Sequence, residues 1–241
     1  MNTRKNGSWL SAAVLILGSA ALLLRRQLYL TGVDGKGLLL RGTLLETGLL
    51  LLTAAVPVLL VLTVEKTAGS PRFEDNYSAG IPAALGHGAM ALGVLSSLLT
   101  AGSLPAGYLG AAWRWLGIAT PFCLLLAGGS RLFRKKPFFL LHVVPCLFLL
   151  VHIVSNYQTW SSLPQLQDYL FGLLGSLALA LFSYYTAAFE ADCGNRRMVR
   201  LTGLAAVYLC LAELGRTHQP LLYLGGAVWA LTGMCRPAQK D

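Results

Sequence analysis

Long blocks of apolar residues, separated by short polar connections, run along the whole of this 241-residue chain. A block of about 20 apolar residues is the length that an α-helix needs to cross the hydrocarbon core of a bilayer. The clearest block is Phe138–Asn156, which carries no formal charge and directly follows the basic run SRLFRKKP. The pattern therefore predicts an all-α fold, a polytopic transmembrane helical bundle. We expect a single integral membrane domain over residues 1–241 and no soluble domain.

Eight apolar blocks have roughly the length of a membrane span. The last two are the shortest, so six or seven crossings also fit the pattern if that pair only partly enters the bilayer. The predicted spans are Ser8–Leu30, Gly42–Val64, Ile81–Ala101, Tyr108–Gly128, Phe138–Asn156, Leu166–Phe189, Leu201–Arg216 and Leu221–Cys235.

Basic residues are unevenly distributed among the connections. Gly102–Gly107 and Asn156–Gln165 contain no Lys or Arg, whereas the connections that alternate with them do. Because Lys and Arg are retained on the cytoplasmic side, this alternation predicts cytoplasmic termini and an external position for the two uncharged connections. Four basic residues around the predicted outer connection between the first two spans depart from the rule. They either reach back to lipid headgroups or form a mouth that attracts anions: Arg25, Arg26, Lys36 and Arg41.

Composition agrees with a membrane protein, since 55% of the residues are hydrophobic and 12% are charged, against about 25% charged in soluble domains. The net charge of +9 is spread between apolar spans, which favours contact with anionic lipid headgroups and argues against nucleic-acid binding. None of the five cysteines forms a CxxC pair, so we expect neither a disulfide framework nor a zinc site. The chain contains no HExxH, GxSxG or Walker motif, so we expect no enzyme and no cofactor.

Two of the predicted spans carry a polar face. At about 100° per residue, polar residues of Phe138–Asn156 fall on one side, and residues spaced by seven follow one side of Leu166–Phe189. Exposure of polar groups to lipid is energetically unfavourable, so both faces should point into the bundle. We expect the second face to pack against the first. The two faces consist of His142, Pro145, Cys146, His152 and Asn156, and of Tyr169, Ser176, Ser183 and Glu190.

Ionisable residues inside spans indicate candidate chemistry, because a charged side chain at the centre of a membrane helix costs about 2.5–3.5 kcal/mol. Five polar or ionisable residues lie at a similar depth in the outer half under the predicted topology. We predict that they line an outward-facing pocket for a small solute or ion: Glu46, Arg114, His152, Asn156 and Glu213. One interpretation pairs Arg114 with Glu46 or Glu213. The other anchors Arg114 at the membrane interface, because Trp113 and Trp115 flank it.

Two stretches, RRQLYLTGVDGKGL at 25–38 and LPQLQDYLFGLLGSLALALFSYYTAAF at 163–189, resemble small polytopic membrane proteins of Gram-positive bacteria. The resemblance implies a bundle of six to eight helices in the bacterial cytoplasmic membrane, and it implies no activity or substrate. Two functions fit the pattern. The polar intramembrane faces favour a carrier or channel for a small solute or ion. The lack of an internal repeat favours a non-transporting sensor, scaffold or partner subunit, in which the buried charges form a structural ion pair. The pattern leaves the oligomeric state open.

Overall fold

The computed structural model describes residues 3–32, 42–64, 70–77, 80–100, 108–133, 135–160 and 169–234. All regular structure in these residues is helical and none is strand, which confirms the predicted all-α class. Each of the eight predicted spans contains one helix, and a short additional helix lies in the connection before the third span. In chain order the helices are α1 (Thr3–Thr31), α2 (Leu44–Thr63), α3 (Phe73–Asn76), α4 (Ile81–Thr100), α5 (Tyr108–Leu132), α6 (Leu140–Trp160), α7 (Leu170–Glu190), α8 (Arg196–Glu213) and α9 (Pro220–Gly233).

Six of these helices are long and apolar enough to cross a bilayer: α1, α2, α4, α5, α6 and α7. The protein is therefore a helical bundle of the membrane type, with several spans. The other two long segments differ from the six in composition or in length. Three arginines occupy the first two turns of α8, and α9 has only 14 residues, or about 21 Å of helix.

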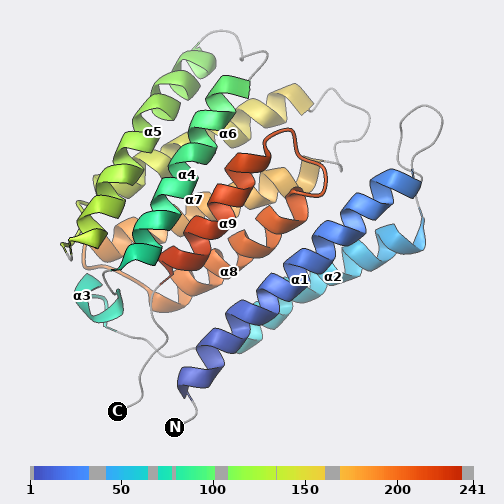
Figure 1. Ribbon diagram of the computed structural model, residues 1–241, viewed down its shortest axis with the longest axis horizontal. Coiled ribbons are helices and arrows are strands. Elements are labelled where there is room, and N and C mark those ends of the chain that lie inside the picture. The colour runs from blue at the N-terminus through green and yellow to red at the C-terminus, as the bar shows by residue number, and fades with distance from the viewer. Residues whose placement is uncertain are drawn as a thin grey trace.

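Successive long helices run in opposite directions, so the bundle has two ends (Figure 1). Helices α1, α4, α6 and α8 begin at one end, and α2, α5, α7 and α9 finish there. We call this end the basic end, because Arg131, Lys136 and the three arginines of α8 lie there. The other end is called the opposite end below. The predicted external connection Gly102–Gly107 and the basic residues Lys36 and Arg41 lie outside the described residues. The second half of the other external connection, residues 161–165, also lies outside them, whereas its first half belongs to α6.

Helix α9 lies along α4, and this pair packs together more extensively than any other pair of described helices. The two backbones touch because glycine lies at the contact on both helices. A Cβ atom added at Gly93 would lie 2.6 Å from the carbonyl oxygen of Leu221, and one added at Gly225 would lie 2.4 Å from that of Ala89. Small residues at such crossings are the usual device for close helix packing within lipid.

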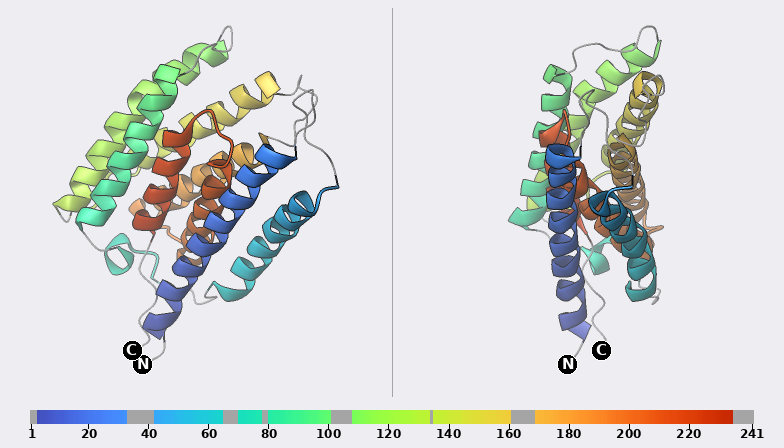
Figure 2. Two further views of the ribbon diagram at one scale, coloured as in Figure 1. Left: turned by 45° about the vertical axis from the view of Figure 1, so that its right-hand side comes forward. Right: turned by 90° about the vertical axis from the view of Figure 1, so that its right-hand side faces the viewer.

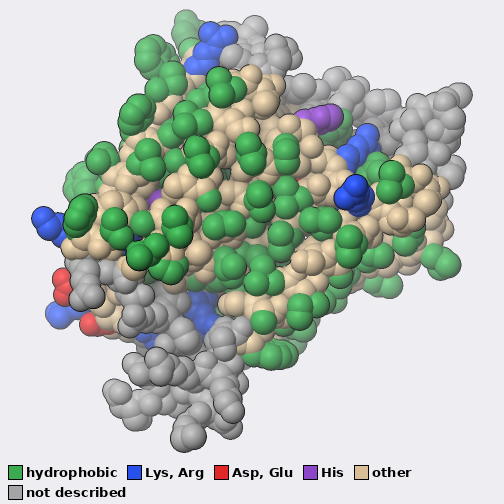
Figure 3. All heavy atoms as spheres, in the orientation of Figure 1, with side chains coloured by type: hydrophobic (Ala, Val, Ile, Leu, Met, Phe, Trp, Pro, Cys, Tyr) green, Lys and Arg blue, Asp and Glu red, His purple; other side chains and the backbone are tan. Residues whose placement is uncertain are grey.

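Helices α1 and α2 form a hairpin at the side of the bundle and attach to it through α8 (Figure 2). The hydroxyl groups of Thr53 on α2 and Tyr208 on α8 lie 3.0 Å apart. The outer side of α2 is apolar, and Leu50, Leu51 and Leu62 are 55%, 67% and 70% exposed. On the face drawn in Figure 3, hydrophobic side chains cover the middle, and charged side chains lie toward the ends of the helices. Exposed leucines in this arrangement are those of a surface that faces lipid.

The predicted polar face of α7 is buried from Ser176 to Glu190, whereas Tyr169 at its start is only partly buried. Ser183 and Glu190 contact α6, as predicted, but Ser176 lies 3.5 Å from the hydroxyl oxygen of Tyr223 on α9. Ser176, Ser183 and Glu190 are at most 3% exposed. The hydroxyl group of Ser183 donates a hydrogen bond to the backbone carbonyl of His142, at 2.7 Å. The face therefore carries hydrogen bonds between helices, in addition to small side chains.

The short helix α3 closes part of the basic end. The side chain of Arg196, at the start of α8, donates to the amide oxygen of Asn76 at 2.7 Å. The backbone N–H of Gly194 donates to the carbonyl oxygen of Pro71 at 3.3 Å. These bonds hold the connection between α2 and α4 against the connection between α7 and α8.

Candidate functional site

Three ionisable side chains from three helices form one chain of contacts inside the basic half of the bundle. His87 on α4 and His142 on α6 meet through their Nε2 atoms, 3.0 Å apart. His142 Nδ1 lies 2.9 Å from each carboxylate oxygen of Glu190 on α7. At its other end, His87 Nδ1 lies 2.6 Å from the backbone carbonyl oxygen of Ala83. Both histidines are fully buried and Glu190 is 3% exposed. We call these three residues the His–His–Glu chain.

The local sequence explains how the imidazoles come together. A Cβ atom added at Gly128 on α5 would lie 3.0 Å from Cβ of His87, so α5 can approach α4 at this level only because residue 128 lacks a side chain. Trp229 on α9 covers the other side of the histidines. Its ring is 9° from parallel with that of His142 and 68° from that of His87, with centroids 6.0 Å apart in both pairs. The imidazoles are therefore fixed in orientation by packing as well as by hydrogen bonds.

The geometry limits where hydrogens can be. A carbonyl oxygen can only accept a hydrogen bond, so the contact with Ala83 assigns a hydrogen to His87 Nδ1. The contact between the two Nε2 atoms needs one hydrogen, which either histidine can supply. The contact between His142 and Glu190 needs another, which comes either from His142 Nδ1 or from a protonated carboxyl group. These three hydrogens leave the chain neutral as a whole.

One proton can therefore occupy any of three groups while the heavy atoms stay in place. It lies on Glu190 when both histidines are neutral and His142 donates to His87. It lies on His142 when that imidazole donates at both nitrogens. It lies on His87 when His87 donates to His142 and His142 donates to Glu190. If the His–His–Glu chain loses this proton, one of its two side-chain contacts has no hydrogen. Two acceptor atoms then face each other in that contact, and the two groups must separate.

A buried cation lies on α5, which packs against α4: the side chain of Arg131 is 2% exposed. Its guanidinium carbon lies 4.2 Å from the centroid of the Tyr77 ring and 4.9 Å from that of Phe73. An arginine stacked on aromatic rings can remain charged while it is buried.

Glu213, predicted to be available to Arg114, is instead paired with Arg25. Both side chains are buried, and Arg25 Nη1 donates to the Glu213 carboxylate and, at 3.2 Å, to the carbonyl oxygen of Ala212. The predicted pairing of Arg114 with Glu213 is therefore wrong. The interpretation of Arg25 as a headgroup-seeking or mouth residue is also wrong, because this side chain is 2% exposed and joins α1 to α8.

The other predicted partner of Arg114 is also occupied. The carboxylate of Glu46 accepts a hydrogen bond from the backbone N–H of Gly42 at 2.7 Å, and the Glu46 N–H bonds to the Thr43 hydroxyl at 3.2 Å. This is a reciprocal cap at the start of α2. Arg114 is exposed and makes no ion pair with the side chains that the structure describes. Its predicted pairing with Glu46 is therefore wrong as well.

His152 and Asn156 are the two predicted site residues that contact each other. The Trp113 indole N–H donates to His152 Nδ1 at 3.3 Å, and the Asn156 amide group lies 2.9 Å from His152 Nε2. An indole N–H can only donate, so His152 Nδ1 is the acceptor of the bond from Trp113. Among the described residues, the hydrogen bonds and ion pairs of Glu46, Arg114 and Glu213 do not reach this pair. The five predicted residues thus form separate local clusters.

Sequence reasoning placed His142 and Glu190 on polar faces but did not join them. In the described part of the chain, no group of three or more His, Cys, Asp or Glu side chains is arranged to hold a metal ion. No protein-family model, no curated protein and no solved structure matches the chain.

Proposed function

We propose that the protein is a proton-coupled membrane carrier for a small solute or ion, and that the His–His–Glu chain is its protonation site. One observation carries the proposal: three ionisable groups from α4, α6 and α7 are fully connected inside an apolar bundle. Ionisable groups at such positions are costly, and they commonly mark ion or proton pathways. Histidine is suited to this role because each of its ring nitrogens can donate or accept a hydrogen bond, so a proton can pass between neighbouring groups.

The coupling step follows from the hydrogen count. With its proton, the chain has one hydrogen in each contact and holds the three helices together. Without it, one contact brings two acceptors within 3.0 Å, and the repulsion pushes two helices apart at that level. Proton binding and release can thus bias the bundle between two arrangements of α4, α6 and α7, which is the requirement for coupling.

The proposal includes a topology. All eight long helices cross the bacterial cytoplasmic membrane, both termini are cytoplasmic, and the basic end faces the cytoplasm and its anionic lipid headgroups. The 18 residues of α8 give about 27 Å of helix, close to the bilayer core, and its arginines all lie at the basic end. Reporter fusions at Ser103 and Gly194 should give opposite signals. The same signal at both positions would contradict this topology.

A second candidate is a proton-binding sensor or partner subunit that does not transport. The supporting observation is an apolar layer beyond the histidines. On the side toward the opposite end, α4, α5 and α6 contribute fully buried apolar side chains, at Met90, Val94, Leu124, Phe148 and Leu149. A layer of this kind suits a closed state of a carrier, and it also suits a protein in which the proton never crosses.

Proton flux into vesicles tests the proposal. The purified protein is reconstituted with a pH-sensitive dye inside, and a potassium diffusion potential is applied. We expect the wild-type protein to move protons and Glu190→Gln to reduce the flux to that of empty vesicles, because an amide cannot release a proton. The matched control is His152→Gln, which removes an equally buried histidine at the opposite end and should keep the flux.

Two outcomes would count against a carrier. If wild-type vesicles move no more protons than empty ones, across a panel of small solutes, transport is excluded under those conditions. Infrared difference spectra between pH 5 and pH 8 then test the sensor, which requires a Glu190 carboxyl signal that is missing in Glu190→Gln. If Glu190→Gln moves protons as fast as the wild type, the His–His–Glu chain is not the protonation site.

A further inference from the structure

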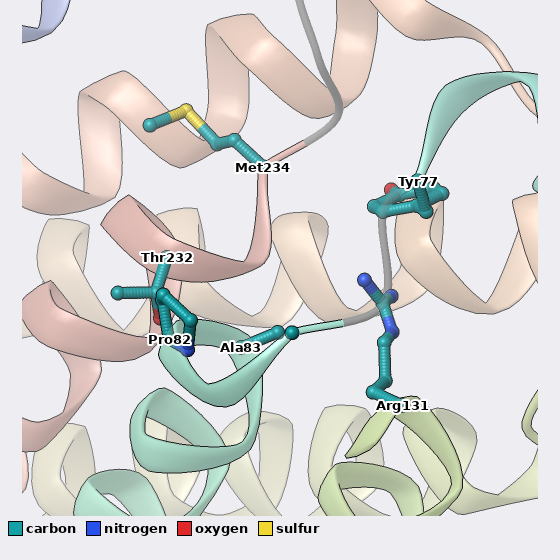
Figure 4. Close-up of a pocket in the computed structure, with 7 residues that line it drawn as sticks. Tyr77, Pro82, Ala83, Arg131, Thr232 and Met234 are labelled. Carbon is teal, nitrogen blue, oxygen red and sulfur yellow. The ribbon is translucent and has the colours of Figure 1, made fainter. Parts of the chain in front are cut away.

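A small cavity lies at the basic end, next to the His–His–Glu chain. Its volume is about 110 Å³, whereas one water molecule needs about 10–15 Å³ measured in this way. The cavity can therefore hold a molecule or ion of several heavy atoms. Its described lining residues are Tyr77, Gly80, Pro82, Ala83, Arg131, Thr232 and Met234 (Figure 4).

The charge of this lining has one sign. Arg131 supplies a buried cation, and no described lining residue is acidic. In Figure 4 the guanidinium group lies beside the Tyr77 ring at one side of the cavity, and Thr232 and Met234 lie at the other. A cation that is shielded from bulk water attracts an anion far more strongly than one in water does.

The backbone near the cavity also favours a bound anion. Gly80 directly precedes α4, and Pro82 and Ala83 lie in its first turn, where the positive end of the helix dipole favours negative charge. The cavity thus combines a partly open volume, a buried arginine and the N-terminus of a 20-residue helix.

We propose that this cavity binds a small oxyanion, with Arg131 donating hydrogen bonds to its oxygens. Arginine presents N–H groups in a plane, which fits the oxygens of a phosphate or carboxylate group. Pro82 and Met234 offer apolar contact to a short organic part of such a ligand. The phosphate group of a lipid and a free anion share this chemistry, and the experiment separates the two sources.

The cavity also borders the proposed protonation site. Ala83 lines the cavity, and its carbonyl oxygen is the acceptor for His87 Nδ1. Only Ala83 would therefore separate an anion in the cavity from His87, the first residue of the His–His–Glu chain. The oxyanion proposal rests on the cavity alone and does not require that protons move.

Anion binding to the purified full-length protein in an uncharged detergent provides the test. Calorimetry with inorganic phosphate, acetate and nitrate should detect binding of at least one anion to the wild-type protein. We expect Arg131→Gln to weaken that binding by about tenfold or more, because charge-assisted hydrogen bonds are lost. Arg114→Gln is the matched control, since it removes an exposed arginine from the same helix and should bind as the wild type does.

Two further variants keep the test decisive. Ala83→Leu fills part of the cavity while Arg131 stays in place, so it should also weaken binding, even if Arg131→Gln fails to fold. Glu190→Gln should bind the anion normally, so the oxyanion proposal and the protonation proposal fail separately.

Nanodiscs distinguish the source of the anion. Phosphate binding in phosphatidylcholine discs identifies a soluble anion. If phosphate fails to bind but phosphatidylglycerol co-purifies with the wild type and not with Arg131→Gln, the occupant is a lipid headgroup. If neither binds, or if folded Arg131→Gln and Ala83→Leu both bind as the wild type does, the proposal is overturned.

Discussion

The two ends of the bundle hold buried charge in different ways. At the opposite end Arg25 and Glu213 form an ion pair between α1 and α8. At the basic end, His87, His142 and Glu190 form a chain across α4, α6 and α7. Arginine does not lose its proton in proteins, so Arg25 keeps its charge in the first cluster. The histidine chain has three arrangements of the same protons. The two clusters are equally buried and differ in the number of proton positions that their contacts allow.

Aromatic side chains pack against both clusters: Trp229 against the histidines, and Phe171 against Arg25. The Arg25 guanidinium carbon lies 4.9 Å from the centroid of the Phe171 ring, so the arginine is held by an aromatic face as well as by Glu213. Glycine at position 172, beside Glu213, leaves room for this arrangement, since a Cβ there would lie 2.9 Å from the Tyr223 hydroxyl oxygen. The Arg25–Glu213 pair is built as a fixed clamp between α1 and α8.

The largest effect should come from breaking the fixed pair. Arg25→Met leaves the Glu213 carboxylate buried without its cation, which should destabilise the fold by about 3–5 kcal/mol. The midpoint temperature of unfolding in detergent measures the loss. The double variant Arg25→Met with Glu213→Leu removes both charges and should recover most of the stability. A single variant that unfolds at the wild-type temperature would contradict the clamp.

A smaller effect should follow from truncating the proton chain. Glu190→Ala removes the partner of His142 Nδ1, and an unsatisfied buried group costs about 1–3 kcal/mol. The cost is lower than for Arg25 because the truncation leaves a polar group, and not a certain charge, without its partner. Glu190→Gln keeps a polar partner of the same shape and should be closer to the wild type in thermal unfolding. An equal loss in both variants would mean that the shape of the site, and not its hydrogen bond, is what the fold needs.

A third, smaller loss of stability should follow from changing Trp113 but not from changing Trp115, and both residues lie at the opposite end. Trp113→Phe removes the indole N–H that bonds to His152, so it should cost about 0.5–1.5 kcal/mol. Trp115→Phe is the control, because Trp115 is 74% exposed and should change stability little. Similar losses in the two variants, measured by thermal unfolding, would show that the bond to His152 contributes nothing.

The sequence predicted the helices well because apolar length is a local property. Each predicted span contains a helix, and the spacing by seven along Ser176, Ser183 and Glu190 identified the buried face of α7. The pairing of ionisable side chains, in contrast, joins residues that are far apart in the sequence. Arg25 and Glu213 are 188 positions apart, and His87 and His142 are 55 positions apart. The pattern within one helix places a charged residue on a buried face. It does not specify which charged residue of another helix will pair with it.

A usable signal for Arg25 did exist in the sequence. Val14, Gly18, Ala21, Arg25 and Leu28 recur every three or four residues and form one buried face of α1. The arginine lies within a face of small and apolar residues, so the same periodicity that places Ala21 inside also places Arg25 inside. Counting basic residues by connection, without following the helical face, assigned it to the surface.

The smallest effect, and the one with a defined pH dependence, belongs to an exposed contact at the basic end. Asp192 follows α7, and its carboxylate accepts hydrogen bonds from Lys136 and from the backbone N–H of Phe73 at 3.3 Å. These partners, Lys136 first, lower the pKa of Asp192 from its usual 3.8. A carboxyl group with a lowered pKa contributes stability above pH 3.8, and the contribution is lost as the pH falls through the lowered pKa.

Asp192→Asn tests this contact with little disturbance of the backbone. Residue 192 has a φ of 58°, a left-handed conformation that Asn also adopts readily. The unfolding temperature of the variant should lie slightly below that of the wild type at pH 7, and the two should converge as the pH falls below the lowered pKa of Asp192, because protonation then removes the charge of the wild-type carboxylate. High salt should also reduce the difference, since an exposed ion pair is screened. A difference that persists unchanged at low pH would mean that the side-chain shape at position 192, and not its charge, joins α3 to the turn after α7.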